Sequence, residues 1–397
     1  MKYVIIRCED VAKFGPHTTS LLEGAKTSHL QQLSQAGAAG LIRTQPAGNL
    51  LGLRPRSAID RPGILAGLVG LSAEDPDAAA GRWYAAAAQH RAGPDEIAWC
   101  CDLVTQQDGI VVDATAGDIT TKESQVLADA LNNQLGSDTR RWSVLDGPQL
   151  VLITRDPALA PDRRAVLPSP GLLLGQDWKR QLPRGGCGDG LAALLEQSAK
   201  ILEEHFVNRV RIDLGENPAT LLWCWGGSEL APVPGFTART GLSGALVSSA
   251  PVARGMAAAY GLHAEAATAA LDEPGVRQIQ SSVIKLLKRF DIVYAHLQVR
   301  SADPVERLCA MERIDQSLLK PLSDQLPKLS TWRLLAAIDD CADGSVAFIG
   351  LGSGLPQHPV ARLRAEALSD SALAFRDGAE LFAWLTAGRE AASAAAD

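Results

Sequence analysis

In the N-terminal part of the chain, hydrophobic residues occur in short runs that are typical of strands and, between these runs, at the spacing of a helix. This pattern predicts an α/β fold. Residues 3–6 form a short β-branched and aromatic run that is typical of a buried strand. Residues 18–35 carry leucines and alanines at helical spacing and are followed by Gly37, and residues 40–42 are apolar again. A strand, a helix and a strand in this order predict a βαβ unit, and therefore a parallel sheet with a right-handed crossover.

The same alternation of strands and helices returns in the C-terminal part of the chain. Strands are expected at residues 220–225, 244–248, 291–297, 334–338 and 346–349, and helices at residues 251–260, 276–289, 305–319 and 379–385. We therefore expect residues 1–78 and 216–397 to form one discontinuous α/β core.

The middle of the chain has a different order of predicted strands and helices. Residues 97–103 and 109–112 predict strands joined by a turn, and residues 150–153 predict another strand. Thr120 and Glu123 have the spacing of a capping box at the start of a helix. A Pro-rich connector and an amphipathic helix over 191–205 follow. Residues 79–215 are therefore expected to form a smaller inserted α+β domain.

Composition and charge narrow the class of protein. A chain of 397 residues is too long for one ordinary compact domain, and 46% hydrophobic with 21% charged residues can bury a large core. The net charge of −7 does not favour nucleic acid as a partner. No apolar run reaches the length of a membrane span or a signal peptide. We therefore expect a cytoplasmic protein that binds neither nucleic acid nor membranes.

The cysteines are scattered, odd in number and without a Cys-x-x-Cys pair. In a chain without an export signal, this pattern favours reduced buried thiols over disulfide bonds or a zinc site. The seven residues are Cys8, Cys100, Cys101, Cys187, Cys224, Cys309 and Cys341.

Short motifs occur in a fixed order over most of the chain. They are Leu22-Glu23-Gly24-Ala25-Lys26-Thr27, Gly81-Arg82, Asp113-Ala114-Thr115-Ala116-Gly117-Asp118, Leu222-Trp223-Cys224-Trp225-Gly226-Gly227, Phe290-Asp291-Ile292-Val293-Tyr294-Ala295-His296 and Met311-Glu312-Arg313-Ile314-Asp315. In order and spacing this set resembles the archaeal-type cofactor-independent phosphoglycerate mutases of the alkaline phosphatase superfamily. The resemblance implies a glycolytic isomerase with an alkaline-phosphatase-like parallel-sheet core, sandwiched by helices and interrupted by an inserted domain.

Members of that family act through a serine that takes up the phosphoryl group, and through two divalent metals, typically manganese, held by Asp and His. The family's spacing before Gly70 points to Arg61 at the serine position, and a shifted loop brings in Ser57 as a weak candidate. The first metal ligand follows the first strand, where Arg7 stands at or beside the expected position. Glu9 or its neighbour Asp10 could replace that ligand if the turn is shifted, but the favoured interpretation is that both are solvent-facing acids of a loop.

The later metal ligands are also altered. Where the resemblance implies Asp-x-x-Gly-His, the chain has Asp303 without the Gly-His pair. Asp303 and Pro304 also have the residue types of an N-cap and first helical position, and this structural interpretation is favoured. Where the family has Asp-His, the chain has Asp340 and Cys341, which could still bind a metal if the thiol ionises. His296 ends a strand and is interpreted as a satisfied core histidine.

The inserted domain of the family binds the phosphate and carboxylate of its substrate with arginines. Arg82 remains as a weak candidate for that role. Two other implied arginines are replaced by Cys100 and Asp118, and Asp102 and Asp146 add further negative charge. These changes oppose an anionic substrate.

Two hypotheses follow. The first is a pseudoenzyme, without a metal cofactor, that keeps the fold to bind an unidentified small molecule or protein, and a homo-oligomer is compatible with this hypothesis. The second is a divergent metal-dependent phosphomutase, phosphotransferase or hydrolase acting on phosphoglycerate or another small phosphate ester. That enzyme would use Mn²⁺ or another divalent metal at Asp340 and Asp303, with Cys341 or Glu9. The loss of several ligands together favours the first hypothesis.

Overall fold

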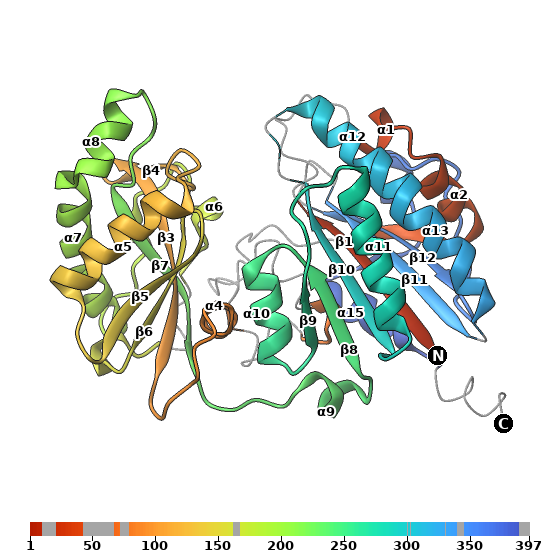
Figure 1. Ribbon diagram of the computed structural model, residues 1–397, viewed down its shortest axis with the longest axis horizontal. Helices are drawn as coiled ribbons and strands as arrows, with labels where there is room; N and C mark the ends of the chain where they lie inside the picture. The colour runs from red at the N-terminus through yellow and green to blue at the C-terminus, as the bar shows by residue number, and fades with distance from the viewer. Residues whose placement is uncertain are drawn as a thin grey trace. The chain divides into compact units, whose positions relative to one another are not determined.

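The computed structural model describes residues 1–9, 21–42, 67–71, 79–161, 167–299, 301, 303–329, 331–339 and 345–388. The chain divides into two compact units (Figure 1). The described residues of the core unit fall within Met1–Gly48, Ile64–Ser72 and Pro234–Asp397, and those of the inserted unit within Ala73–Val233.

An eight-stranded sheet forms the centre of the core unit. Its order is β13 (Ala374–Phe375), β2 (Ala38–Ile42), β12 (Val346–Gly352), β11 (Trp332–Ile338), β1 (Lys2–Glu9), β10 (Ile292–Gln298), β8 (Gly244–Ser248) and β9 (His263–Ala266). The five strands from β11 to β9 run parallel to one another, whereas β12 is antiparallel to both of its neighbours. The parallel strands therefore share one carboxyl edge.

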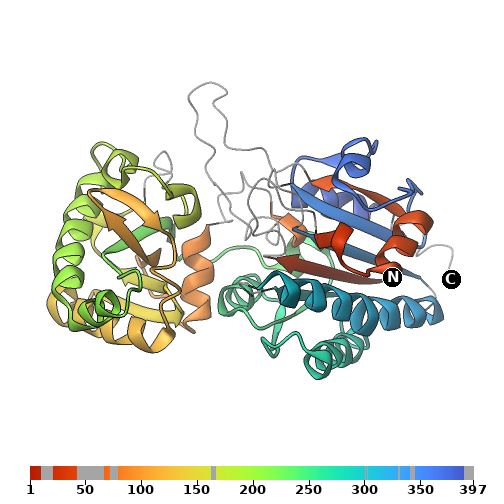
Figure 2. The same cartoon turned by 90° about the horizontal axis from the view of Figure 1, so that it is seen from above.

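Helices cover both faces of this sheet. The helices of the core unit are α1 (Leu21–Gly24), α2 (Ser28–Ala36), α9 (Phe236–Thr240), α10 (Pro251–Ala259), α11 (Glu273–Leu287), α12 (Pro304–Ile314), η3 (Asp315–Leu319), α13 (Lys320–Gln325), η4 (Leu326–Lys328), α14 (Ala365–Ser369) and α15 (Gly378–Thr386). Figure 2 shows the teal and blue helices α11, α12 and α13 along one face. On that face Val4, Ile6 and Cys8 of β1 pack in one apolar cluster with these helices. On the other face Phe348 packs against Trp384 of α15. Helices therefore lie on both faces of a sheet with five adjacent parallel strands, and the predicted α/β fold class is confirmed.

The helix predicted over residues 18–35 is two helices in the described region, α1 and α2. The break between them is stabilised from a distant part of the chain, since the backbone N–H groups of His29 and Leu30 donate to the carboxylate of Asp315 at 3.1 and 2.7 Å. These bonds satisfy amide groups that the first turn of a helix leaves without partners. Burial raises the pKa of Asp315.

An antiparallel five-stranded sheet forms the centre of the inserted unit. Its strands are β4 (Ile110–Asp113), β3 (Ile97–Gln107), β6 (Gln149–Thr154) and β5 (Arg140–Asp146), with β7 (Leu221–Glu229) on the other side of β3. The main helices are α4 (Ala80–Ala87), α5 (Thr121–Leu135), α7 (Cys187–Glu204) and α8 (Phe206–Asp213), and shorter ones are η1 (Pro157–Leu159), α6 (Pro170–Leu173) and η2 (Trp178–Gln181). The predicted capping box of Thr120 and Glu123 is present at the start of α5.

The inserted unit extends to Val233, beyond the boundary at residue 215 that the sequence suggested. The reason is β7, which pairs with β3 instead of entering the parallel sheet. Its first five residues are buried, so its sequence resembles that of a strand in a parallel core. Gly81 lets α4 approach this sheet closely, because a Cβ there would lie 2.3 Å from the carbonyl oxygen of Ala98. Within the described ranges, no helix combines the length and apolar character needed to cross a bilayer.

Candidate functional site

Five polar residues meet at the carboxyl edge of the parallel strands in the core unit. The register places Arg7 of β1 beside His296 of β10, and His296 beside Ser248 of β8. Glu9 ends β1, and Asp339 directly follows β11. All five side chains are buried, so the favoured interpretation of Glu9 as a solvent-facing loop acid was wrong: Glu9 is the last residue of a buried strand. In open α/β sheets this edge is where ligands usually bind, so the cluster is the candidate functional site.

The guanidinium group of Arg7 is the centre of this cluster. Its Nη2 atom donates to Oδ1 of Asp339 at 2.6 Å, and its Nε atom lies 3.9 Å from Oε1 of Glu9. Its Nη1 atom donates to the carbonyl oxygen of Cys8 at 2.9 Å. Burial alone would lower the pKa of Arg7, but the carboxylates of Asp339 and Glu9 raise it above its usual value. The site therefore contains a permanent internal cation.

Polar contacts continue from Glu9 to His296 and Ser248. The Oε2 atom of Glu9 lies 3.0 Å from Nε2 of His296, and Nδ1 of His296 is 2.7 Å from Oγ of Ser248. The Ser248 hydroxyl also accepts the N–H of Ala250 at 3.0 Å. His296 is 3% exposed and Ser248 is fully buried. His296 is therefore a buried core histidine, as predicted, but it is only partly satisfied: Nδ1 is bonded to Ser248, whereas Nε2, although close to Glu9, makes no hydrogen bond with the described residues.

The described residues of this edge do not fit a divalent metal. A two-metal phosphate site requires several carboxylate and imidazole ligands directed at the ions. Among the residues that the structure describes, no group of three or more His, Cys, Asp and Glu side chains is arranged to hold a metal ion. Instead, Arg7 neutralises Asp339 and lies close to Glu9, and a fixed cation there repels a second one. The candidates Ser57, Asp340 and Cys341 lie outside the described residues.

Asp303, the other predicted metal-ligand candidate, caps a helix. Its Oδ1 atom accepts the backbone N–H of Val305 at 2.9 Å, and Pro304 occupies the first turn of α12. Its side chain is exposed, unlike those of Glu9 and Asp339. The favoured interpretation of Asp303 as an N-cap is confirmed.

Arg82, the predicted substrate-binding candidate of the inserted unit, binds backbone. Its guanidinium donates to the carbonyl oxygen of Ala231 at 2.6 Å and to that of Glu229 at 2.9 Å. These contacts tie α4 to the end of β7 and the segment that follows it. Arg82 therefore has a structural task in this unit.

The loop that joins β4 to α5 is held by Asp113. Its carboxylate accepts the N–H groups of Thr115 and Gly117 at 2.8 and 3.0 Å and the side-chain amide of Asn217 at 2.7 Å. Burial would raise the pKa of Asp113, but these hydrogen bonds lower it below its usual value. The bonds hold a backbone in which Gly117 and both of its neighbours have positive φ. At that turn the side chain of Asp118 is exposed.

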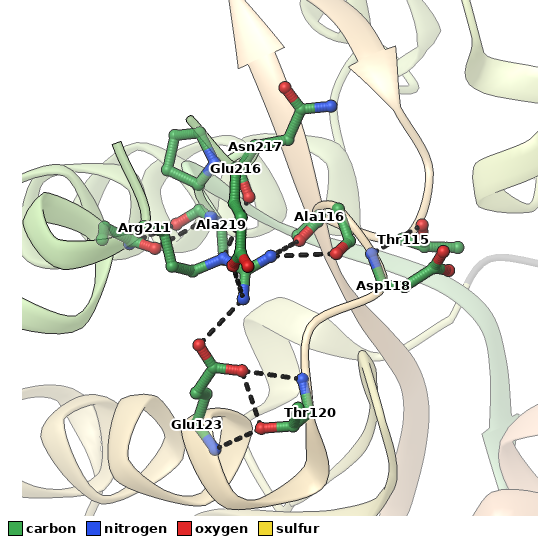
Figure 3. A network of polar contacts seen from close by, with 12 residues as sticks. Thr115, Ala116, Asp118, Thr120, Glu123, Arg211, Glu216, Asn217 and Ala219 are labelled. Carbon is green, nitrogen blue, oxygen red and sulfur yellow. Dashed lines mark hydrogen bonds and ion pairs between the residues drawn. The ribbon is translucent and has the colours of Figure 1, made fainter. Parts of the chain in front are cut away.

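Arg211 of α8 supports the same loop, and the sequence reasoning missed it. Figure 3 shows its guanidinium between the loop and the start of α5. It donates to the carbonyl oxygens of Ala116 and Gly117 at 2.8 and 3.0 Å, and to the carboxylate of Glu123 at 2.8 Å. The sequence offered one indication that Arg211 is buried. It follows the buried Val207 by four residues and therefore lies on the same inner face of α8.

Most of the inserted unit and most of the chain match known proteins. A family model described as 2,3-bisphosphoglycerate-independent phosphoglycerate mutase matches residues 80–208. A protein of that name from Methanothrix thermoacetophila is 28% identical over 360 residues, which cover 85% of this chain and 86% of the relative. A probable mutase of the same name from Geobacter sulfurreducens is 26% identical, with the same coverage of each chain. The family resemblance predicted from the sequence is confirmed.

Two solved structures share the fold. The PH0037 protein from Pyrococcus horikoshii has a TM-score of 0.66 at 16% identity, covering 97% of this chain and 96% of its own. The cofactor-independent phosphoglycerate mutase from Thermoplasma acidophilum has a TM-score of 0.54 at 18% identity, covering 97% and 99%. At these identities the likeness concerns the fold alone.

Proposed function

We propose that this relative of the 2,3-bisphosphoglycerate-independent phosphoglycerate mutases is a cytoplasmic pseudoenzyme, which has lost metal-dependent phosphotransfer and keeps the fold for a binding or assembly role. The observation that carries the proposal is the buried guanidinium of Arg7, 2.6 Å from Asp339 and 3.9 Å from Glu9. The internal cation neutralises carboxylates that a metal would otherwise require.

The size of this electrostatic effect supports the proposal. Two like unit charges 4 Å apart repel by about 4 kcal/mol at the effective dielectric constant of a protein surface, and the repulsion doubles for a dication. A metal would therefore bind only if Arg7 left the cluster, and this would break its bonds to Asp339 and to the carbonyl oxygen of Cys8.

The inserted unit supports the same proposal. The resemblance implies an arginine at position 118, but the exposed turn there presents the carboxylate of Asp118. The remaining arginine of the motif set, Arg82, is engaged with backbone carbonyl groups. A phosphorylated, carboxylated substrate would meet negative charge at this loop.

Metal content and turnover test the pseudoenzyme proposal. The purified protein is dialysed against manganese, analysed for bound metal, and assayed with 3-phosphoglycerate and with p-nitrophenyl phosphate. The Methanothrix thermoacetophila relative, treated identically, serves as the positive control. We expect neither stoichiometric manganese nor turnover. Bound metal together with turnover that is lost on Asp340→Asn would instead establish the divergent enzyme.

An assembly role is supported by the outer face of α8. Four large apolar side chains on and directly after this helix are between 51% and 70% exposed: Phe206, Val210, Ile212 and Leu214. Such a concentration of exposed apolar surface marks interaction sites. Arg209 and Asp213 are also exposed, one helical turn apart. In an antiparallel pair of α8 helices, the arginine of each copy would face the aspartate of the other, so we propose a second copy of this chain as the partner.

Light scattering after size-exclusion chromatography tests this partner. We expect twice the mass of a single chain for the wild type, and the mass of one chain for Val210→Glu. Val112→Glu is the matched control, since Val112 is a comparably exposed apolar residue of the same unit on β4. A wild-type protein that is monomeric at high micromolar concentration would exclude the proposed self-association.

A further inference from the structure

Two buried cysteines of the inserted unit lie against each other. Cys101 of β3 is directly opposite Cys224 of β7 in the antiparallel register. Their Sγ atoms are 3.3 Å apart, within contact distance, and both residues are fully buried. The sequence pattern favoured reduced buried thiols and gave no sign of this pair, since the two cysteines are 123 positions apart along the chain. Folding of the sheet creates the pair.

The backbone geometry is compatible with a covalent link. Opposite residues of an antiparallel ladder have Cα atoms about 4.5 to 5.5 Å apart. Disulfide bonds in proteins span Cα separations of about 4.4 to 6.8 Å, with sulfur atoms about 2.05 Å apart. Small side-chain rotations that bring the two sulfur atoms together are therefore sufficient, and the strands keep their register.

We propose that Cys101 and Cys224 are a modification site, at which a peroxide oxidises the folded protein to a reversible cross-strand disulfide. One thiolate attacks a peroxide oxygen, the O–O bond breaks, and the sulfur becomes a sulfenic acid with release of water. The other thiolate then attacks that sulfur, the S–O bond breaks, and a second water leaves. The two thiols lose two electrons and two protons in total, and one hydrogen peroxide is reduced to two waters.

Burial determines how fast this reaction runs. It raises the pKa of Cys101 well above the usual value, so little thiolate is present at neutral pH. Because the thiolate is the reactive form, we expect slow oxidation at neutral pH and faster oxidation at higher pH. The pair therefore responds to sustained oxidation, unlike an exposed thiol.

The site has a nearby matched control. Cys100 is adjacent to Cys101 on β3, is equally buried, and is opposite Trp225 instead of a cysteine. Successive side chains of a strand point to opposite faces of the sheet, so Cys100 and Cys101 face different surroundings. A link that is specific to the proposed geometry must therefore require Cys101 and not Cys100.

The experiment treats the full-length folded protein with hydrogen peroxide at pH 8, blocks the remaining thiols under denaturing conditions, and maps the peptides by mass spectrometry. We expect one peptide pair joined through Cys101 and Cys224, about 2 Da lighter than the two reduced peptides together, and separated again by dithiothreitol. Cys100→Ala should retain the link, and Cys101→Ala and Cys224→Ala should abolish it.

A stability readout accompanies the map, since six of the eight tryptophans, all except Trp332 and Trp384, belong to the inserted unit. The urea midpoint followed by tryptophan fluorescence should rise on oxidation in the wild type and Cys100→Ala, and should stay unchanged in Cys101→Ala. The proposal is overturned if the oxidised wild-type protein, still folded by circular dichroism, lacks the Cys101–Cys224 peptide pair. It is equally overturned if Cys224 is joined to Cys100 instead.

Discussion

Each unit of this molecule contains a buried arginine that organises its surroundings, but the two do so differently. Arg7 of the core unit is fully buried and directs its charge at the carboxylates of Asp339 and Glu9. Arg211 of the inserted unit is 2% exposed and donates to three backbone carbonyl groups, and it also pairs with the partly exposed carboxylates of Glu123 and Glu216 at 2.8 and 3.1 Å. The first arrangement balances charge, whereas the second fixes the shape of a loop.

The difference separates two tasks of a buried guanidinium group. The loop around Gly117 is held in its backbone form because Arg211 and Asp113 satisfy its polar groups, and the side chain that it exposes is Asp118. At the edge of the parallel sheet, Arg7 supplies positive charge to the surrounding carboxylates. Substitutions of Arg211 and Arg7 can therefore test loop support and charge balance separately.

The largest effect is expected from Arg211→Met. This change removes the donors of three backbone carbonyl groups and leaves Glu123 and Glu216 without this cation. A carbonyl group left buried without its donor costs about 1 to 3 kcal/mol, whereas the two ion pairs contribute less because both carboxylates are partly exposed. We expect a decrease of about 4 kcal/mol in the free energy of unfolding of the inserted unit. Urea unfolding followed by tryptophan fluorescence measures this value.

Arg141→Met is the control for that substitution, because Arg141 belongs to the same unit but is exposed and lies outside α8. Surface substitutions of this kind usually change stability by less than about 0.5 kcal/mol. Equal stability of the Arg211→Met and Arg141→Met proteins would show that the loop is held by other contacts.

A somewhat smaller effect, about 3 kcal/mol at pH 7, is expected from Arg7→Met. Without the guanidinium, the buried carboxylates of Glu9 and Asp339 lose a nearby positive charge, so their ionised forms are less favourable in the folded variant than in the folded wild type. Protonation of these carboxylates relieves that loss, so the stability deficit of the variant shrinks as the pH falls from 7 to 5. Circular dichroism during urea unfolding, with hydrogen exchange of β1 and β10 peptides, follows the core unit.

Arg376→Met is the matched control in the core unit, since Arg376 is exposed and forms a surface ion pair with Glu380. Such pairs contribute about 0 to 1 kcal/mol. If the stability deficit of Arg7→Met were the same at pH 5 and pH 7, charge balance would not be the task of Arg7.

Local patterns in the sequence were sufficient for much of this architecture. Short runs of apolar residues predicted β1 and β10, and the spacing of Thr120 and Glu123 predicted the capping box of α5. Asp303 was interpreted correctly as an N-cap, because the cap and its Pro304 are adjacent in the chain. Each of these features depends on residues close together in sequence.

Features that depend on distant residues could not be predicted in the same way. The break between α1 and α2 is stabilised by Asp315, almost three hundred residues away. The pairing of β7 with β3 moved a buried strand into the inserted unit. The sequence placed Arg7 near the first metal-ligand position, but its contact with Asp339 spans 332 positions and required the parallel register. A single sequence contains no local signal for such contacts.

The smallest expected effect concerns the acid that joins Arg211 to the capping box. Burial would raise the pKa of Glu123, but hydrogen bonds from Thr120 and Arg211 lower it below its usual value. A carboxylate with a lowered pKa in the folded state stabilises the protein above its usual pKa, and this contribution is lost as the pH falls, here between about pH 5 and pH 3. Glu123→Gln should therefore lower the stability of the inserted unit by about 1 kcal/mol at pH 7, with a difference from the wild type that vanishes towards pH 3.

Urea midpoints measured by fluorescence across this range test the prediction, with the exposed Glu203→Gln as control. A difference that stays constant with pH would mean that Glu123 acts through packing, and that charge has no part in how Arg211 supports the inserted unit.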